Sequence, residues 1–142
     1  MTSPRSTAPP LKVAGRGTTV TGAVLTSHSN DGDGDIAGNL VRVAAAHFAE
    51  GSLRATSFGH ISQVEHTWAF FTKPGGYASL NEAQVGLSES TCAGVFDDVA
   101  SSGKLSIVDL SEIALERAHS ASEAVWVLGN LSETEGYNDN AE

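Results

Sequence analysis

The chain has 142 residues, of which 40% are hydrophobic and 18% are charged, and its net charge at pH 7 is −9. This length suggests one domain with a substantial core, and this composition is typical of a folded globular protein rather than a disordered one. An acidic chain repels phosphate groups, which argues against binding to nucleic acid and against docking on anionic membranes.

Residues 1–10 are rich in Ser, Thr and Pro and predict a flexible tail. They contain no apolar stretch of the kind found in secretory signals, and no run in the chain approaches the ~20 apolar residues of a membrane span. The single cysteine, Cys92, excludes an internal disulfide framework. These features favour a cytoplasmic location, although the sequence leaves the location open.

The first half of the chain predicts extended structure. Leu11–Ala14 and residues 23–28 are apolar or β-branched segments separated by glycines, which predicts a hairpin. Residues 29–35 alternate Asp with Gly and predict a loop. Residues 39–46 fit either a strand or a short helix, because their periodicity does not decide between the two.

A second antiparallel pair is expected in the middle of the chain. Residues 66–71 are aromatic and β-branched, as strands usually are, and residues 73–76 contain the Pro-Gly-Gly of a turn. Residues 84–91 are the candidate partner strand.

The last third predicts two consecutive helices. Asp109 and Glu112 have the spacing of a capping box, and Ser120 and Glu123 repeat it. Apolar residues then follow at helical spacing, and Gly136 is the expected C-terminal cap. They are Ile113, Leu115, Ala118, Ala124, Val125, Val127, Leu128 and Leu131. The predicted fold class is therefore α+β, with antiparallel strands followed by two helices.

The acidic loop invites a calcium interpretation, because Asp31, Asp33 and Asp35 alternate as in the first half of an EF-hand loop. The template then fails, since Ile36 stands where it requires Gly and Arg42 where it requires Glu. A solvated acidic turn and the rim of an active site are the alternatives. The five histidines include no i, i+4 pair, so we expect no metal site and no cofactor.

Cys92 is the obvious candidate nucleophile, but a catalytic cysteine needs an activating partner, which is usually histidine. No local pattern links Cys92 to His60 or His66. Since free cysteines are among the most buried residues, we expect Cys92 to be a core thiol.

Three stretches, read in order, resemble the dipeptidase A and secernin-like cysteine peptidases, which are N-terminal-nucleophile hydrolases. They are residues 24–32, residues 64–96 with their Leu-Asn-Glu (80–82) and Glu-Ser-Thr-Cys (89–92), and residues 110–137 with their Leu-Glu-Arg-Ala (115–118). The resemblance implies part of a four-layer αββα fold over residues 11–137, with residues 138–142 as a tail.

The resemblance also implies a chemistry, in which an N-terminal cysteine attacks the amide of a dipeptide or small amide and its own α-amino group acts as the base. It implies supporting site residues here: Asn81 as an oxyanion or substrate-amide contact, and Asn30 and Asp31 beside the nucleophile, with Asp31 orienting the substrate amine.

The chain departs from this pattern at the nucleophile. Residues 8–11 read Ala-Pro-Pro-Leu where the family has its cysteine. A fragment or mis-spliced form of a dipeptidase, a non-catalytic homologue, and an unrelated acidic binding domain are the three explanations. In the first two, we expect the chain to be inactive as written, and exposed strand edges would favour self-association.

Overall fold

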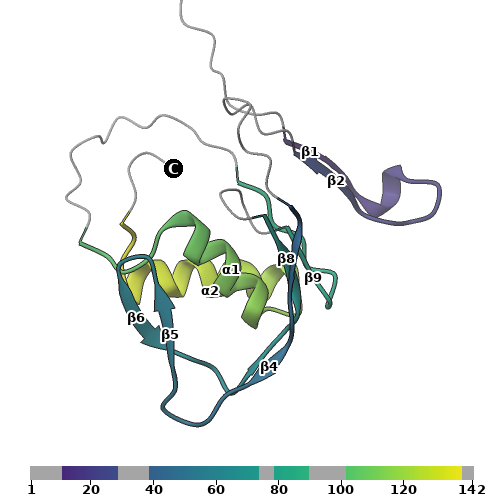
Figure 1. Ribbon diagram of the computed structural model, residues 1–142. Coiled ribbons are helices and arrows are strands. Elements are labelled where there is room, and N and C mark those ends of the chain that lie inside the picture. Colours follow the sequence, from purple (N-terminus) through teal and green to yellow (C-terminus); the bar gives the residue numbers. More distant parts are fainter. Residues whose placement is uncertain (1–10, 29–38, 74–78, 90–101, 139–142) are drawn as a thin grey trace, which may run out of the picture.

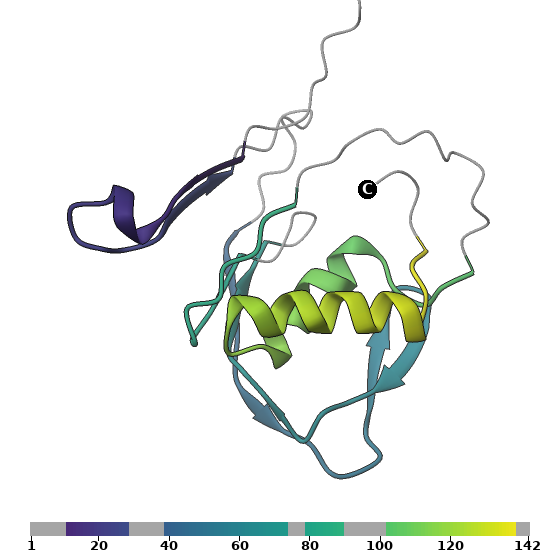
Figure 2. The ribbon, with the colours of Figure 1, turned by 180° about the vertical axis from the view of Figure 1, so that it is seen from behind.

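The computed structural model describes residues 11–28, 39–73, 79–89 and 102–138. Within these ranges, short antiparallel strands come first and two helices follow, which confirms the α+β class. Helices α1 (Ile107–Arg117) and α2 (Ala121–Thr134) pack against each other. Figure 1 shows the helix pair lying beside the strands, and Figure 2 shows α2 in front of α1 from behind.

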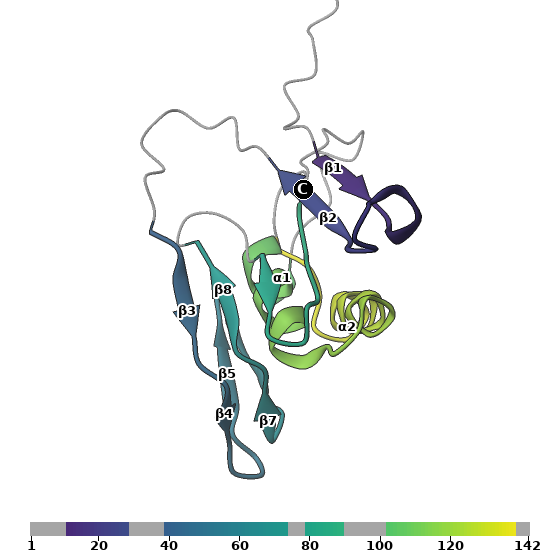
Figure 3. The same cartoon turned by 90° about the vertical axis from the view of Figure 1, so that its right-hand side faces the viewer.

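The predicted N-terminal hairpin is confirmed. Strand β1 (Leu11–Ala14) pairs antiparallel with β2 (Leu25–His28), and a short 3-10 turn, η1 (Arg16–Thr18), lies between them. This hairpin lies apart from the other elements in all three ribbon views (Figures 1, 2 and 3). An isolated two-stranded ribbon is only marginally stable in water, so contacts with another surface would stabilise it.

Residues 39–46 form strands and no helix. Strand β3 (Val41–Val43) pairs with β8 (Phe70–Thr72), and β4 (Ala46–His47) pairs with β7 (His66–Thr67). The strand expected over residues 66–71 is therefore interrupted between β7 and β8. The interruption has a cause, because the Trp68 N–H donates to the carbonyl of Glu116 in α1 instead of to a neighbouring strand.

The prediction of a strand over residues 84–91 is wrong for residues 84–89, which the structure describes and which form no named strand. The partner of β8 is β9 (Leu80–Asn81), which is only two residues long. Beyond it the chain turns back, because Gln84 adopts a φ of 63° and the Asn81 N–H donates to the Val85 carbonyl. Residues 90 and 91 lie outside the described ranges.

The sequence did not predict the hairpin of β5 (Leu53–Thr56) and β6 (Gly59–Ser62). Arg54 and Ile61 are opposite each other on the side that faces α1, where Ile61 is buried. Leu53, next to Arg54 in the strand, is 65% exposed on the other side.

The helix boundaries follow local capping chemistry, with one correction. Helix α1 begins after Ser106, not at Asp109: the Ser106 hydroxyl accepts from the Asp109 N–H, and the Asp109 carboxylate accepts from the Ser106 N–H. Asp109 is thus the third residue of the helix and completes a reciprocal capping box. Helix α2 has the predicted cap, Ser120, and ends next to Gly136, whose φ of 77° suits the left-handed position after a helix.

The core lies between the helices and the strands. One buried cluster joins β6 to both helices, and a second joins β8 to the end of α1 and the start of α2. The first contains Ile61, Leu105, Leu110, Ile113, Ala114, Val127 and Leu131, and the second contains Phe70, Val85, Leu115, Ala118 and Ala124. The predicted apolar stripe of α2 is correct at Ala124, Val127 and Leu131 but wrong at Val125, which is 70% exposed.

The helices cover one face of the β3–β8–β9 sheet. Phe70 and Asn81 point to the helix side and are buried, whereas Phe71 and Leu80 form a cross-strand pair on the opposite side and are 38% and 45% exposed. Figure 3 shows β3, β4, β5, β7 and β8 on one side of the helix pair. Among the described residues, no helix has the length and apolar character that crossing a membrane requires.

Candidate functional site

Asn81 is the one predicted site residue that lies within the described ranges, and its side chain joins β9 to the end of α1. It is 3% exposed. Its Nδ2 donates to the carbonyls of Leu115, at 2.9 Å, and Ala118, at 2.7 Å, and its Oδ1 accepts from the Val85 N–H at 2.9 Å. The last carbonyls of a helix have no partner within the helix, so this side-chain amide satisfies two of them.

This arrangement does not fit the expected role of Asn81 as an oxyanion contact. A side-chain amide has two N–H donors, and both are already used for helix carbonyls. An oxyanion would have to displace one of them and leave a buried carbonyl without a donor. Asn81 therefore has a structural role in this arrangement. Asn30, Asp31, Asp33, Asp35 and Cys92 all lie outside the described residues.

A charged cluster lies between β5, β8 and α1. Arg54 Nη2 is 3.1 Å from Glu112 Oε2 and 3.1 Å from Glu116 Oε1, and Arg54 Nε donates to the same Glu116 oxygen at 3.1 Å. Thr72 Oγ1 donates to Glu112 Oε1 at 3.0 Å. The side chain of Glu116 is only 8% exposed and that of Arg54 is 20% exposed, so water screens this cluster poorly.

Burial raises the pKa of the Glu116 carboxyl, and the attraction of Arg54 offsets this only in part. The sequence did not predict this cluster, and Glu112 was expected in a capping box. A usable signal existed, because Glu112 and Glu116 are four residues apart and so lie on one face of a helix, where like charges repel. Such a pair predicts a cation nearby, but the sequence does not identify Arg54 as that cation.

A polar network at the start of α1 connects the helix to the β5–β6 turn. The Asp109 carboxylate accepts hydrogen bonds from the backbone N–H groups of Ser57 and Ser106, both at 3.0 Å. Burial alone would raise the pKa of Asp109, but these hydrogen bonds hold it below its ordinary range. The carboxylate is therefore ionised at neutral pH and fixes the helix start against the hairpin.

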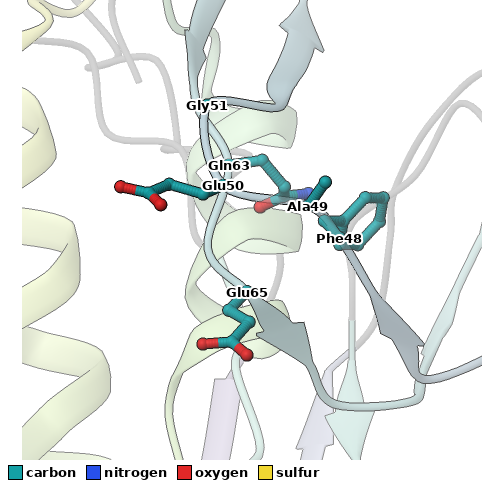
Figure 4. Close-up of a pocket in the computed structure, with 6 residues that line it drawn as sticks. All are labelled: Phe48, Ala49, Glu50, Gly51, Gln63 and Glu65. Atoms are coloured by element: carbon teal, nitrogen blue, oxygen red, sulfur yellow. The ribbon is translucent and has the colours of Figure 1, made fainter.

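Two surface grooves lie outside these networks. The first has a volume of about 410 Å³ at the bend between the β4–β7 and β5–β6 pairs, and its lining residues are Phe48, Ala49, Glu50, Gly51, Gln63 and Glu65. Figure 4 shows the side chains of Glu50 and Glu65 extending in different directions, both away from the Phe48 ring. The charged groups of this lining are the two carboxylates, and it contains no thiol, hydroxyl or cationic side chain.

The second groove, which we call the α2 groove, has a volume of about 310 Å³, and its lining residues are Val64, Arg117, Glu123, Trp126, Val127, Asn130 and Leu131. It combines apolar walls with one guanidinium and one carboxylate. Binding pockets often have this composition, with mostly apolar walls and a few polar groups that orient the ligand.

Within the described ranges, no group of three or more His, Cys, Asp or Glu side chains is arranged to hold a metal ion. His47 and His66 stand opposite each other on β4 and β7 with ring centroids 4.8 Å apart, but they are only two potential ligands. Comparison of the chain with protein-family models, with curated proteins and with solved structures found no match.

Proposed function

We propose that residues 11–137 form part of a domain related to the cysteine dipeptidases, and that this chain does not hydrolyse dipeptides itself. The observation that carries the relationship is the Asn81 contact. Asn81 belongs to the Leu-Asn-Glu stretch, and the carbonyls it binds belong to Leu115 and Ala118 of the Leu-Glu-Arg-Ala stretch. Two of the three stretches that carry the resemblance are thus neighbours in the folded chain. One helix layer against antiparallel strands is also compatible with half of an αββα fold.

The chemistry of the family explains why we expect this chain to be inactive. In the family, attack requires a thiol on the residue that also supplies the free amino group. The first strand here begins with Leu11, and Cys92, the only cysteine, is about eighty positions further along the sequence. Asn81 has no spare amide hydrogen to stabilise an oxyanion, a contribution that is usually large in acyl transfer.

Purified chain incubated with a panel of dipeptides tests the proposal. We expect no release of amino acids above a heat-inactivated control. Turnover that survives the substitution Cys92→Ser would contradict the proposal outright, and turnover that is lost with Cys92→Ser would identify Cys92 as a nucleophile and equally contradict it. The relationship itself is tested at the genomic level, where a cysteine codon in frame shortly before Leu11 would support it.

We also propose that the chain self-associates, with the N-terminal hairpin of one copy bound to a second copy of the chain. Val13 and Leu25 of the hairpin are 65% and 58% exposed. Residues 11–28 contain Lys12 and Arg16 and no acidic residue, whereas the whole chain has a net charge of −9. A cationic, apolar hairpin is therefore complementary to the acidic remainder of another copy.

Light scattering on a size-exclusion column tests this pairing. We expect a dimer at low salt that the double substitution Val13→Ser and Leu25→Ser converts to a monomer, while Val20→Ser, which changes an exposed residue of the loop, leaves it intact. A wild-type chain that is monomeric at about 100 μM, well above the micromolar range of specific association, would overturn the proposal.

A further inference from the structure

The α2 groove contains a charged group with an unused donor. Arg117 is the last residue of α1, and its Nη2 donates to the Ser62 carbonyl at 2.8 Å. Its Nε is buried and has no hydrogen-bond partner among the described residues. A buried donor of a charged group without an acceptor is unfavourable, so this guanidinium is poorly satisfied by the chain itself. Its Nη2 end lies at the surface, where an acceptor from outside the chain can reach it.

The electrostatic surroundings of Arg117 favour an anionic acceptor. Burial lowers its pKa, the nearby carboxylate of Glu116 raises it, and the guanidinium of Arg54 lowers it again, so that the pKa lies below its ordinary value. Arg54 already contacts Glu116 and Glu112. The Glu135 carboxylate also raises the pKa of Arg117, and an additional negative charge would further offset the cost of burying this guanidinium.

A group of opposite sign lies on the α2 side of the groove. The Glu123 carboxylate accepts from the His119 N–H at 2.7 Å and also contacts His119 Nδ1. The hydrogen bond from the His119 backbone lowers the pKa of Glu123, so this carboxylate is ionised at neutral pH. The groove thus has a positive group from α1 and a negative group from α2 in its lining.

The apolar wall is formed by one face of α2. Val127 and Leu131 are buried at 6% and 5% exposure, and Trp126 is 66% exposed. An exposed tryptophan ring beside buried aliphatic groups is a surface against which an apolar side chain can pack. A groove volume of 310 Å³ lies near the lower end of the range of about 300–1,000 Å³ for small-molecule sites, which favours a small ligand.

We infer that the α2 groove binds a free apolar α-amino acid, with its carboxylate at Arg117, its ammonium group at Glu123 and its side chain against Trp126 and Val127. This ligand carries the two charges that the groove complements and an apolar group of suitable size. The inference stands independently of the proposed relationship to dipeptidases, because no residue invoked here is part of the implied hydrolytic machinery.

The test is a titration of the full chain with L-leucine, followed by the NMR signal of the Trp126 indole N–H, which the spectrum of Trp126→Phe distinguishes from that of Trp68. We expect a saturable shift at millimolar concentrations. L-Leucinamide lacks the carboxylate and N-acetyl-L-leucine lacks the ammonium group, and each should bind about 10-fold more weakly, as expected for the loss of a charge-assisted contact.

The variants give a second, independent readout. Arg117→Met should weaken leucine binding about 10-fold or more, whereas Val125→Ala, which changes an exposed neighbour of Trp126 outside the groove, should leave it unchanged. Any of three results would overturn the inference. Leucine and leucinamide could bind equally, leucine and N-acetyl-leucine could bind equally, or no saturable shift could appear up to about 10 mM. The comparison of ligands decides the matter even if Arg117→Met does not fold.

Discussion

Replacing Asn81 with alanine removes the contact that joins β9 to the end of α1. Three buried backbone groups then lose their partners: the carbonyls of Leu115 and Ala118 and the N–H of Val85. The helix cannot replace the lost donor to Leu115, because the N–H that would normally reach this carbonyl belongs to His119 and donates to Glu123. The substitution therefore leaves the groups unpaired in a site where Asn81 is 3% exposed.

The expected loss follows from these three groups. A buried polar group without a partner costs about 1–3 kcal/mol, and water entering the space left by the amide would relieve part of this. We therefore expect Asn81→Ala to lower the free energy of unfolding by about 3 kcal/mol. Asn81→Asp should be at least as harmful, because it keeps an acceptor for Val85 but places a carboxylate against two carbonyl oxygens.

Urea unfolding followed by tryptophan fluorescence measures this loss. With a denaturant slope of about 2 kcal/mol/M, the midpoint should fall by about 1.5 M. Asn39→Ala is the matched control, because Asn39 is exposed, and it should leave the midpoint nearly unchanged. A loss below about 1 kcal/mol for Asn81→Ala would refute the structural role, since it would mean that the three groups find other partners or were never buried.

Three further substitutions test other contacts. Arg54→Met leaves the Glu112 and Glu116 carboxylates without their cation and should cost about 2–3 kcal/mol at pH 7. Burial raises the pKa of Glu116, so its ionisation opposes folding as the pH rises through that pKa. The loss of stability caused by Arg54→Met should therefore be smaller at pH 5 than at pH 7. Asp109→Asn should lower stability by about 1 kcal/mol at pH 7. The lowered pKa of Asp109 contributes stability that is lost as the pH falls through that pKa. The free energies of unfolding of wild type and Asp109→Asn should therefore converge in acid. Gly103→Ala should destabilise by about 2 kcal/mol, because its Cβ would lie 2.1 Å from the Gly136 carbonyl carbon, whereas Gly129→Ala, at an open helical position, should not. Chemical denaturation at the stated pH values measures all three, and an unchanged midpoint in any of them would contradict the contact concerned.

The parts of the fold that the sequence predicted are those with local signals. The hairpin of β1 and β2 and both helices depend on glycines, capping residues and apolar spacing within a few positions. The Ser106 box was missed because Asp109 has two possible roles, as a cap or as the third helical residue, and only the backbone geometry distinguishes them.

The strand partners were predicted poorly because their pairing is long-range. Strand β3 pairs with β8 nearly thirty residues away, and β8 takes the two-residue β9 as its other neighbour. Strands this short carry too few residues for a period-2 pattern to be recognised. The cluster of Arg54, Glu112 and Glu116 was missed for the same reason. Arg54 is 58 positions from Glu112 and 62 from Glu116 in the sequence, and they meet only through the packing of β5 on α1.

The position of Asn81 changes what the resemblance to dipeptidases can be used to predict. The Leu-Asn-Glu and Leu-Glu-Arg-Ala stretches bind each other through hydrogen bonds that hold a helix end against a strand. A sequence likeness at such residues can be explained by packing alone, because the carbonyls at a helix end need a donor and a side-chain amide supplies it. It does not report a shared reaction, which depends on a nucleophile and on donors that are free to bind an oxyanion. Stability measurements on Asn81 variants and activity measurements on the chain therefore test different claims. A large loss of stability in Asn81→Ala would support the contact between β9 and the end of α1, and it would leave the proposed lack of dipeptide hydrolysis untested.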